Sequence, residues 1–305
     1  MEILSFGLSV DSGTDFGGSR LKKLYRPLRL CYFGEVVRSE GTILRPERQF
    51  LQIGAEIIGE KNYLADVEIL SLAFESLQIV GIKNIFVEFS NQIFLDQIIN
   101  SGLAPNKKKD FLMYLKRKDK LKSLSILEDN KKKKLLENLF NSRGNLKSKI
   151  KMLDVLRINN RCSEEIDNLL EIHKSINKKY KNINFNIDFT EYKIDSYYSG
   201  TNFTVFAKNV RGEIASGGRY LTNNRNGEFA TGFTCYMDTI LRASSYTLKQ
   251  NRILVPFDTN KTQIQKLINK NFIIERSLNS VEKLSVVAKT KNCTHFFSNG
   301  KIKKI

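Results

Sequence analysis

The sequence predicts a mixed α+β protein: an antiparallel sheet flanked by helices, with a helical insertion and a small C-terminal α/β unit. Strand-like and amphipathic helical segments alternate over residues 28–89, which predicts a sheet with helices packed against it. From about residue 105 to residue 181, Lys, Leu, Asn and Glu recur at helical spacing without a strand signal. Residues 251–305 alternate strand and helix again, as expected for a self-contained unit. We therefore expect a core over residues 1–245, interrupted by the helical insertion, and a second domain over residues 251–305.

Each element is predicted by the spacing of its apolar residues. Alternation of apolar and polar residues predicts strands, and apolar residues three and four apart predict helices. In the core, we expect strands at residues 28–37, 49–58, 84–89, 183–188 and 202–208 and in a segment ending at Tyr220. We expect helices at 65–80, 92–101 and 236–245, and residues 231–235 lead into the last of these. In the C-terminal unit, we expect strands at residues 253–257, 272–276 and 294–298 and helices at 262–269 and 281–289.

The composition is typical of a globular protein except for its charge. Hydrophobic residues make up 41% of the 305 residues and charged residues 27%, but the formal net charge is +18. A surface this basic attracts phosphates or acidic partners, so an RNA-binding module is one reading of the chain. Surfaces that bind single-stranded nucleic acid usually interleave basic residues with aromatic residues on which the bases stack. The lysines of this chain occur in short runs without such aromatic residues. The pattern therefore favours solvated lysine faces over a nucleic-acid groove.

The cysteines and histidines offer little material for a metal site or a catalytic triad. There are only two histidines, and the cysteines form no C-x-x-C pair; they are Cys31, Cys162, Cys235 and Cys293. No apolar run is long enough for a membrane span, and the N-terminus lacks the order of a signal peptide. We expect a cytoplasmic protein without a metal or cofactor.

The strand at residues 49–58 carries the first candidate site residues. Its side chains alternate, so that Gln52 and Glu56 share one face while the apolar residues between them share the other. Gly54 lies between the two polar residues, and the missing side chain is expected to leave room for something to lie against the backbone. A solvated hairpin is the alternative interpretation of this stretch alone.

Polar clusters recur at the ends of the predicted strands. Each cluster alone has an ordinary structural explanation, such as a tight turn or one core and one surface aromatic. Paired tyrosines can form flat walls with hydroxyl tips, and a double glycine allows a ligand to approach the backbone closely. The clusters are Arg38 with Glu40, Gln52 with Glu56, Tyr197 and Tyr198 in YYSG, and Ser216–Tyr220 in SGGRY.

Their order along the chain resembles that of the histidyl-tRNA synthetase family of class II synthetases. R-x-E followed by RQF-x-Q-x-x-x-E-x-x-G resembles motif 2, and ATGFTCYMDTIL resembles motif 3. YYSGTNFTVF and ASGGRY resemble two further elements of that family, and the likeness runs from about Pro27 to Ser245. The resemblance implies a class II synthetase-like fold and a site for histidine. In that site Gln52 and Glu56 would engage the α-amino group and its neighbours, Tyr198 and Tyr220 the imidazole, and Arg38 would lie on the carboxylate or phosphate side. Tyr197 is expected among the histidine-binding residues as well.

Departures from the family pattern predict that the synthetase chemistry is lost. Thr239 takes the place of the motif 3 arginine that clamps ATP phosphates, and a hydroxyl cannot form that bidentate clamp. Lys193 takes the place of an arginine ahead of the tyrosine pair, and Leu221 that of an aspartate after GGRY. We therefore expect Glu40, Lys193, Arg219 and Thr239 to mark at most a vestigial nucleotide side. Nothing before Pro27 resembles motif 1, so the core is expected to be N-terminally shortened.

With these losses the chain resembles the regulatory subunits of ATP phosphoribosyltransferase. Those subunits act in histidine biosynthesis and keep the synthetase core without its chemistry. PLRLCYFGEVVR, FLQIGAEIIGEKNYLADVEILSLA and FLMYLKRKD are similar to that family in detail. The resemblance implies a non-enzymatic subunit that binds the short-form catalytic subunit, senses histidine and forms a homodimer within a hetero-oligomer. A divergent histidyl-tRNA synthetase that charges tRNA with ATP is the alternative.

Overall fold

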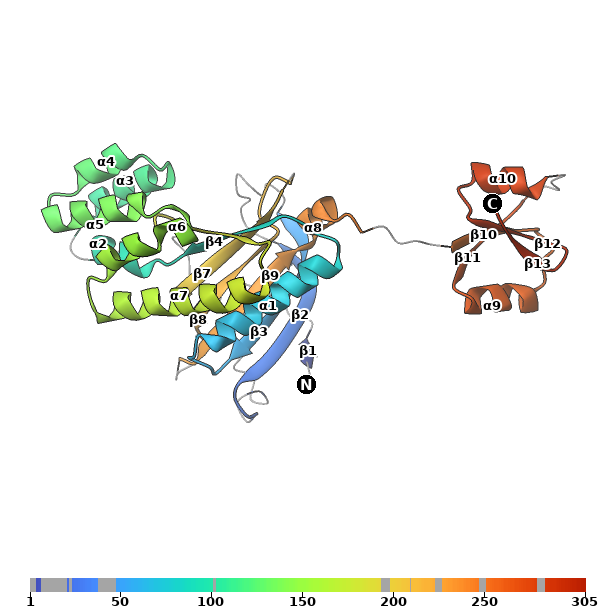
Figure 1. Cartoon of the computed structure of the whole chain (residues 1–305), viewed down its shortest axis with the longest axis horizontal. Helices are drawn as coiled ribbons and strands as arrows, with labels where there is room; N and C mark the ends of the chain where they lie inside the picture. The colour runs from blue at the N-terminus through green and yellow to red at the C-terminus, as the bar shows by residue number, and fades with distance from the viewer. Residues whose placement is uncertain are drawn as a thin grey trace. The chain divides into compact units, whose positions relative to one another are not determined.

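The computed structural model describes residues 4–6, 21, 24–37, 48–100, 103–192, 198–208, 210–222, 227–246, 251–278 and 283–305. The chain divides into two compact units, Met1–Ser245 and Tyr246–Ile305 (Figure 1).

A mixed sheet forms the centre of the larger unit. In the described part of the chain its strands lie in the order β1-β2-β3-β9-β8-β7-β4-β6-β5. They are β1 (Leu4–Phe6), β2 (Leu28–Val37), β3 (Gln49–Ile58), β4 (Ile85–Ser90), β5 (Gly144–Asn145), β6 (Asn184–Ile187), β7 (Tyr198–Ala207), β8 (Ala215–Leu221) and β9 (Phe229–Tyr236). From β2 across to β4 the neighbouring strands are antiparallel, whereas β1 pairs with β2 and β6 with β4 in parallel. The predicted antiparallel sheet is confirmed.

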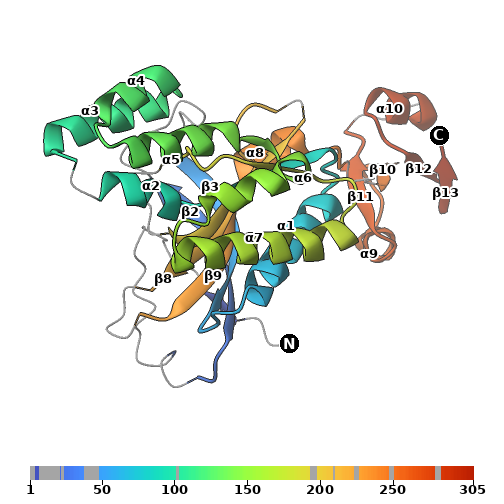
Figure 2. The same cartoon turned by 60° about the vertical axis from the view of Figure 1, so that its left-hand side comes forward.

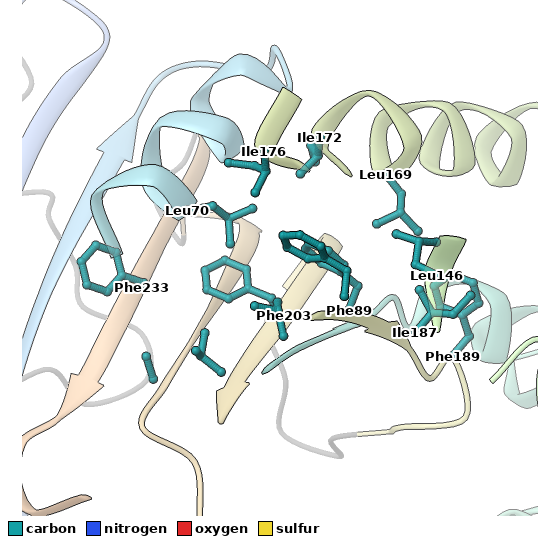
Figure 3. Close-up of a cluster of buried hydrophobic side chains, with 14 of the residues drawn as sticks. Leu70, Phe89, Leu146, Leu169, Ile172, Ile176, Ile187, Phe189, Phe203 and Phe233 are labelled. Atoms are coloured by element: carbon teal, nitrogen blue, oxygen red, sulfur yellow. The ribbon is translucent and has the colours of Figure 1, made fainter. Parts of the chain in front are cut away.

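Two long helices pack side by side against one face of this sheet (Figure 2). These are α1 (Leu64–Ile79) and α7 (Asn160–Lys179), and the short helix α8 (Met237–Ala243) follows β9. The side chain of Asn159 starts α7 by accepting a hydrogen bond from the backbone N–H of Cys162 at 2.8 Å. Figure 3 shows Leu70 of α1, Ile176 of α7 and Phe203 of β7 meeting in the buried apolar core between the helices and the sheet. We call this side of the sheet the helix face.

The predicted insertion is helical but does not form one separate layer. Its first part contains α3 (Pro105–Lys116), α4 (Lys120–Ile126), α5 (Asn130–Asn141), α6 (Leu146–Lys149) and the 3₁₀ helix η2 (Ile150–Leu156), and α2 (Ile93–Ile99) precedes it. The short strand β5 interrupts it and pairs with β6, although the sequence carries no strand signal there. The last helix, α7, belongs to the main core because its apolar side chains lie against the sheet. Strand β5 was not predicted because its two paired residues are too few to produce a periodic pattern in the sequence.

A buried carboxylate fastens the first part of the insertion to the sheet. Asp188, just after β6, is 4% exposed. Its Oδ2 atom accepts from Lys118 Nζ at 3.0 Å and from Arg143 Nε at 2.9 Å, and these cations follow α3 and α5. Burial alone would raise the pKa of Asp188, but Lys118, Thr190 and Arg143 outweigh it and hold this pKa below its usual value. The carboxylate therefore stays ionised and links both helices to the sheet.

The smaller unit is an α/β/α sandwich. Its strands lie in the order β11-β10-β12-β13, where β10 is parallel to β11 and β12, and β13 is antiparallel to β12. They are β10 (Asn251–Val255), β11 (Phe272–Arg276), β12 (His295–Ser298) and β13 (Lys301–Lys304). Helix α9 (Lys261–Asn269) packs on one face and α10 (Leu284–Thr290) on the other. Strand β13 was not predicted, because KIKK offers one apolar residue among lysines.

Candidate functional site

The face of the sheet opposite α1 and α7 carries the polar side chains; we call it the polar face. Residues that pair across antiparallel strands point to the same face, so the register orders this face into rows. In the central row, Glu56 of β3 pairs with Gly232 of β9, Gly232 with Gly218 of β8, and Gly218 with Asn202 of β7. The adjacent row on one side contains Ile58, Ala230, Tyr220 and Tyr198. The rows on the other side contain Tyr32, Gly54, Thr234 and Ser216, and then Gly34, Gln52 and Tyr236.

Glu56 is a buried carboxyl group on this face. It is 8% exposed, and its Oε2 atom accepts a hydrogen bond from the Tyr220 hydroxyl at 3.0 Å. Burial raises the pKa of Glu56 to about 8, although the hydrogen bond from Tyr220 acts in the opposite direction. No described residue forms an ion pair with Glu56. A cationic group placed against it would therefore favour the ionised form.

Gly232 makes room for this carboxyl group. A Cβ atom at position 232 would overlap the Glu56 carboxyl, so only glycine allows Glu56 to lie across the neighbouring strand. Sequence reasoning did not single out Gly232. A glycine inside a strand indicates a close approach, and this signal could have found it.

The space over Gly54 is filled by a side chain of the protein. The sequence predicts that this glycine leaves room for another group to lie against the backbone, and that group is the side chain of Tyr32. The ring of Tyr32 lies over Gly54, where a Cβ atom would collide with it. The Tyr32 hydroxyl is hydrogen-bonded to the Thr234 hydroxyl, and it lies 3.5 Å from the carbonyl oxygen of Phe233. Gly54 therefore accommodates Tyr32, which sequence reasoning did not select.

Gln52 and Tyr236 form the last row. Gln52 is 5% exposed and pairs in register with Tyr236, the last residue of β9. The Tyr236 hydroxyl is hydrogen-bonded to the Ser216 hydroxyl at 2.7 Å, and its ring meets Phe50 edge to face with centroids 5.8 Å apart. The structure thus brings Gln52, Glu56, Tyr198 and Tyr220 to one face, and we call these four residues the Glu56 cluster.

Arg219 lies on the helix face, away from the Glu56 cluster. It precedes Tyr220 in β8, so its side chain points to the opposite side of the sheet. Its Nη2 atom contacts Asp66 Oδ2 of α1 at 2.6 Å, and its guanidinium also donates to the carbonyl oxygens of Glu60 and Asn62. Burial raises the pKa of Asp66 more strongly than Arg219 lowers it. The structure therefore places Arg219 where it fastens α1 to β8, on the face of the sheet opposite the Glu56 cluster.

Thr239 lies in the first turn of α8 and is 1% exposed. Its hydroxyl donates to Asp238 Oδ2 at 3.3 Å. A buried hydroxyl bonded to its neighbour presents no cationic fork for a phosphate. The remaining predicted residues, Arg38, Glu40, Lys193 and Tyr197, lie outside the described residues.

The described residues show neither a cluster of metal ligands nor a membrane-spanning helix. They contain no group of three or more His, Cys, Asp or Glu side chains arranged to hold a metal ion. Within the same ranges, no helix is both long and apolar enough to cross a bilayer.

Comparison with known proteins identifies the family. A family model described as Histidyl-tRNA synthetase matches residues 17–240. The ATP phosphoribosyltransferase regulatory subunit of Rhodospirillum centenum is 31% identical over 288 residues, which cover 94% of this chain and 74% of that protein. This chain belongs to the histidyl-tRNA synthetase-like family of ATP phosphoribosyltransferase regulatory subunits. Another regulatory subunit, from Paramagnetospirillum magneticum, is 29% identical, with 91% of this chain and 72% of that protein covered.

Solved structures show that the fold is that of the histidyl-tRNA synthetase-like family. An ATP phosphoribosyltransferase regulatory subunit/histidyl-tRNA synthetase from Bacillus halodurans matches with a TM-score of 0.70 at 21% identity, covering 90% of this chain and 74% of that one. Histidyl-tRNA synthetase from Nostoc sp. PCC 7120 matches with a TM-score of 0.72 at 15% identity, covering 95% of this chain and 75% of that one. The predicted class II synthetase-like α+β fold is confirmed.

Proposed function

We propose that this chain is a non-catalytic regulatory subunit of ATP phosphoribosyltransferase that binds histidine at the Glu56 cluster. It would assemble with the short-form catalytic subunit in the cytoplasm, as a homodimer within a hetero-oligomer. Its relatives carry the name of this regulatory subunit. A structure of an ATP phosphoribosyl transferase complex from Thermotoga maritima shares the fold, with a TM-score of 0.56 at 18% identity.

The observation that carries the histidine site is the buried Glu56 carboxyl group. An ionised carboxylate at a buried position needs a compensating charge, and none of the described residues supplies one in an ion pair. The α-amino group of an amino acid is a cation that can donate up to three hydrogen bonds to acceptors such as Glu56 and Gln52. The site thus has the chemistry to bind an ammonium group.

The tyrosines provide the second part of the site. Tyr220 and Tyr198 pair in register in the row next to Glu56, so an imidazole attached to that ammonium group would reach their side. Tyrosine hydroxyls can both donate to and accept from a ring nitrogen. Tyr197 would add to this wall and Arg38 would face the carboxylate, as the family resemblance implies.

Calorimetry on the assembled complex tests the site directly. We expect histidine to bind to the complex, Glu56→Ala to abolish the binding signal, and Glu171→Gln to leave it unchanged. Glu171 is a matched control because it lies in α7 with its side chain 45% exposed. Unchanged histidine affinity in Glu56→Ala would remove the proposed site.

Regulation is measured as a change in the activity of the catalytic subunit. If histidine binding and catalysis are coupled as in typical allosteric proteins, histidine should change the partner's activity by about 5- to 150-fold. Glu56→Ala should abolish this change while the complex still assembles. An equal response to histidine with and without this chain would contradict a regulatory role.

A divergent histidyl-tRNA synthetase is the second candidate function, because the fold is shared with such enzymes. Robust ATP–pyrophosphate exchange dependent on histidine would support it and refute the non-catalytic proposal. We expect no exchange, and we do not expect Thr239→Arg alone to restore it. Retention of RNA through purification, with affinity that falls steeply with salt, would instead indicate an RNA-binding module.

A further inference from the structure

The rows on both sides of the central row are filled by packed side chains. On one side, Tyr220 belongs to a buried apolar cluster together with Leu28, Leu30, Ile58 and Ala230. On the other side, the ring of Tyr32 covers Gly54. The central row differs, because two neighbouring positions in it, Gly232 and Gly218, carry no side chains. The polar groups that flank these glycines are therefore the candidates for contact with a ligand at Glu56.

Asn202 of β7 flanks the two glycines on the side opposite Glu56. It pairs in register with Gly218, and its Cβ atom lies where a Cβ atom on Gly218 would collide with it. The side chain is 2% exposed, and its Oδ1 atom accepts a hydrogen bond from the hydroxyl of Ser90 in β4. Ser90 is also its register partner in that strand. Ser90 therefore holds the Asn202 amide in one orientation.

The side chains of Glu56 and Asn202 extend towards each other over the glycines without bonding. The Glu56 carboxyl lies over Gly232, and Asn202 lies against Gly218, the register partner of Gly232. Among the described residues, none donates to Glu56 Oε1 and none accepts from Asn202 Nδ2. Buried polar groups are normally hydrogen-bonded, so each of these atoms lacks a partner that a ligand or a water molecule can supply. The pair offers an acceptor on one side of the glycines and a donor on the other.

We propose that Asn202 is a ligand-binding residue of the site, where its amide donates a hydrogen bond to an acceptor atom of the amino acid whose ammonium group contacts Glu56. The proposal rests on the histidine site proposed above. Histidine carries two kinds of acceptor, the carboxylate and the unprotonated ring nitrogen. Because Ser90 already fixes the amide, little conformational freedom is lost when the hydrogen bond forms.

Calorimetry with histidine on the full chain in complex with its catalytic subunit tests the proposal. Asn202→Asp keeps the shape and the acceptor for Ser90 but removes the N–H donors, so histidine affinity should fall about 10- to 100-fold. Asn184→Asp, at an exposed position of β6, is the matched control and should change the affinity less than about twofold.

Two analogues identify the acceptor. Histidinol lacks the carboxylate, and β-(2-thienyl)alanine lacks the ring nitrogens. The analogue without the acceptor that Asn202 contacts should bind equally well to the wild-type chain and to Asn202→Asp, whereas the other should lose affinity as histidine does.

Several outcomes would overturn the proposal. Unchanged or tighter histidine binding in Asn202→Asp would refute it while leaving the histidine site in place, because the amide would then bond only to water. An equal loss of affinity for both analogues in this variant would also refute it. No histidine binding by the wild-type complex would refute the histidine site itself. If Asn202→Asp does not fold, Ser90→Ala decides: it releases the amide and should weaken histidine binding about threefold to tenfold, and an unchanged affinity would refute the proposal.

Discussion

Replacing Glu56 with glutamine should change how the stability of the larger unit depends on pH. Burial raises the pKa of Glu56 to about 8, from an ordinary value of 4.5. Between pH 4.5 and pH 8, the folded state therefore keeps a proton on Glu56 that the unfolded state has released. Stability from this proton is fully present below pH 4.5 and is lost as the pH rises through 8.

The magnitude follows from the two pKa values. Between pH 6 and pH 9, the group alone lowers the free energy of unfolding by about 2.5 kcal/mol. Glutamine has nearly the same shape and does not titrate, so Glu56→Gln should lose this contribution. The difference in unfolding free energy between variant and wild type should shift by about 2.5 kcal/mol in favour of the variant over this range.

Urea unfolding at pH 6, 7, 8 and 9, followed by far-ultraviolet circular dichroism, measures both curves. The other titrating groups are common to the two chains and cancel in the difference. Curves that run parallel from pH 6 to pH 9 would refute the reasoning, because they would mean that Glu56 titrates normally in the folded chain. Saturating histidine should raise the wild-type curve most at pH 8 and above, where Glu56 is ionised.

Three further variants test individual contacts. Gly232→Ala places a methyl group where the carboxyl of Glu56 lies; it should destabilise the chain by about 1–3 kcal/mol and abolish histidine binding, measured by urea unfolding and calorimetry. Asp188→Asn leaves two cations without their shared carboxylate, and because both are partly exposed we expect a loss of about 1–3 kcal/mol, seen in urea unfolding at pH 7. The pKa of Asp188 lies below its usual value, so its stabilising contribution should itself disappear as the pH falls towards acid. Arg219→Met leaves Asp66 buried and unpaired, and thermal unfolding should show a loss of about 3 kcal/mol.

Each of these variants has a control. Gly227→Ala should have little effect on histidine binding, because no atom lies within 4 Å of the position of its Cβ. Its φ of +51° strains alanine, so this control applies to binding and not to stability. Asp154→Asn, an exposed member of a local ion pair, should change stability by less than about 1 kcal/mol. Adding Asp66→Leu to Arg219→Met should recover part of the lost stability, since the unpaired carboxyl is then removed. A double variant less stable than Arg219→Met would contradict this account of the pair.

Local patterns predicted much of the fold. Alternation in β3 predicted the strand over residues 49–58 and placed Gln52 and Glu56 on one face, and the structure has both there. The helical periodicity after Leu64 likewise predicted α1. These features depend only on neighbours in the chain, because a strand repeats every two residues and a helix every 3.6. Strand β5 was missed because it is two residues long and pairs with the distant strand β6. Strand β13 pairs with its neighbour β12 but was missed because KIKK offers one apolar residue among lysines.

The contents of the candidate site were harder to predict. Alternation shows that Gly54 shares a face with Glu56, but it does not show which side chain of the next strand lies above it. The register of β2 against β3 brings Tyr32 to that position. The same limit applies to Arg219, since alternation separates it from Tyr220 without showing which face holds the helices.

The sequence by itself predicted the family, the α+β fold and the residues that form the polar side of β3. The tertiary structure alone decided that Glu56 is buried against Gly232, that Tyr32 fills the space over Gly54, and that Tyr236 contacts Phe50 and is hydrogen-bonded to Ser216. The physical reason is that the first set follows from the order of residues along one chain segment. The second set depends on the register between strands far apart in sequence, which is settled only when the whole sheet packs.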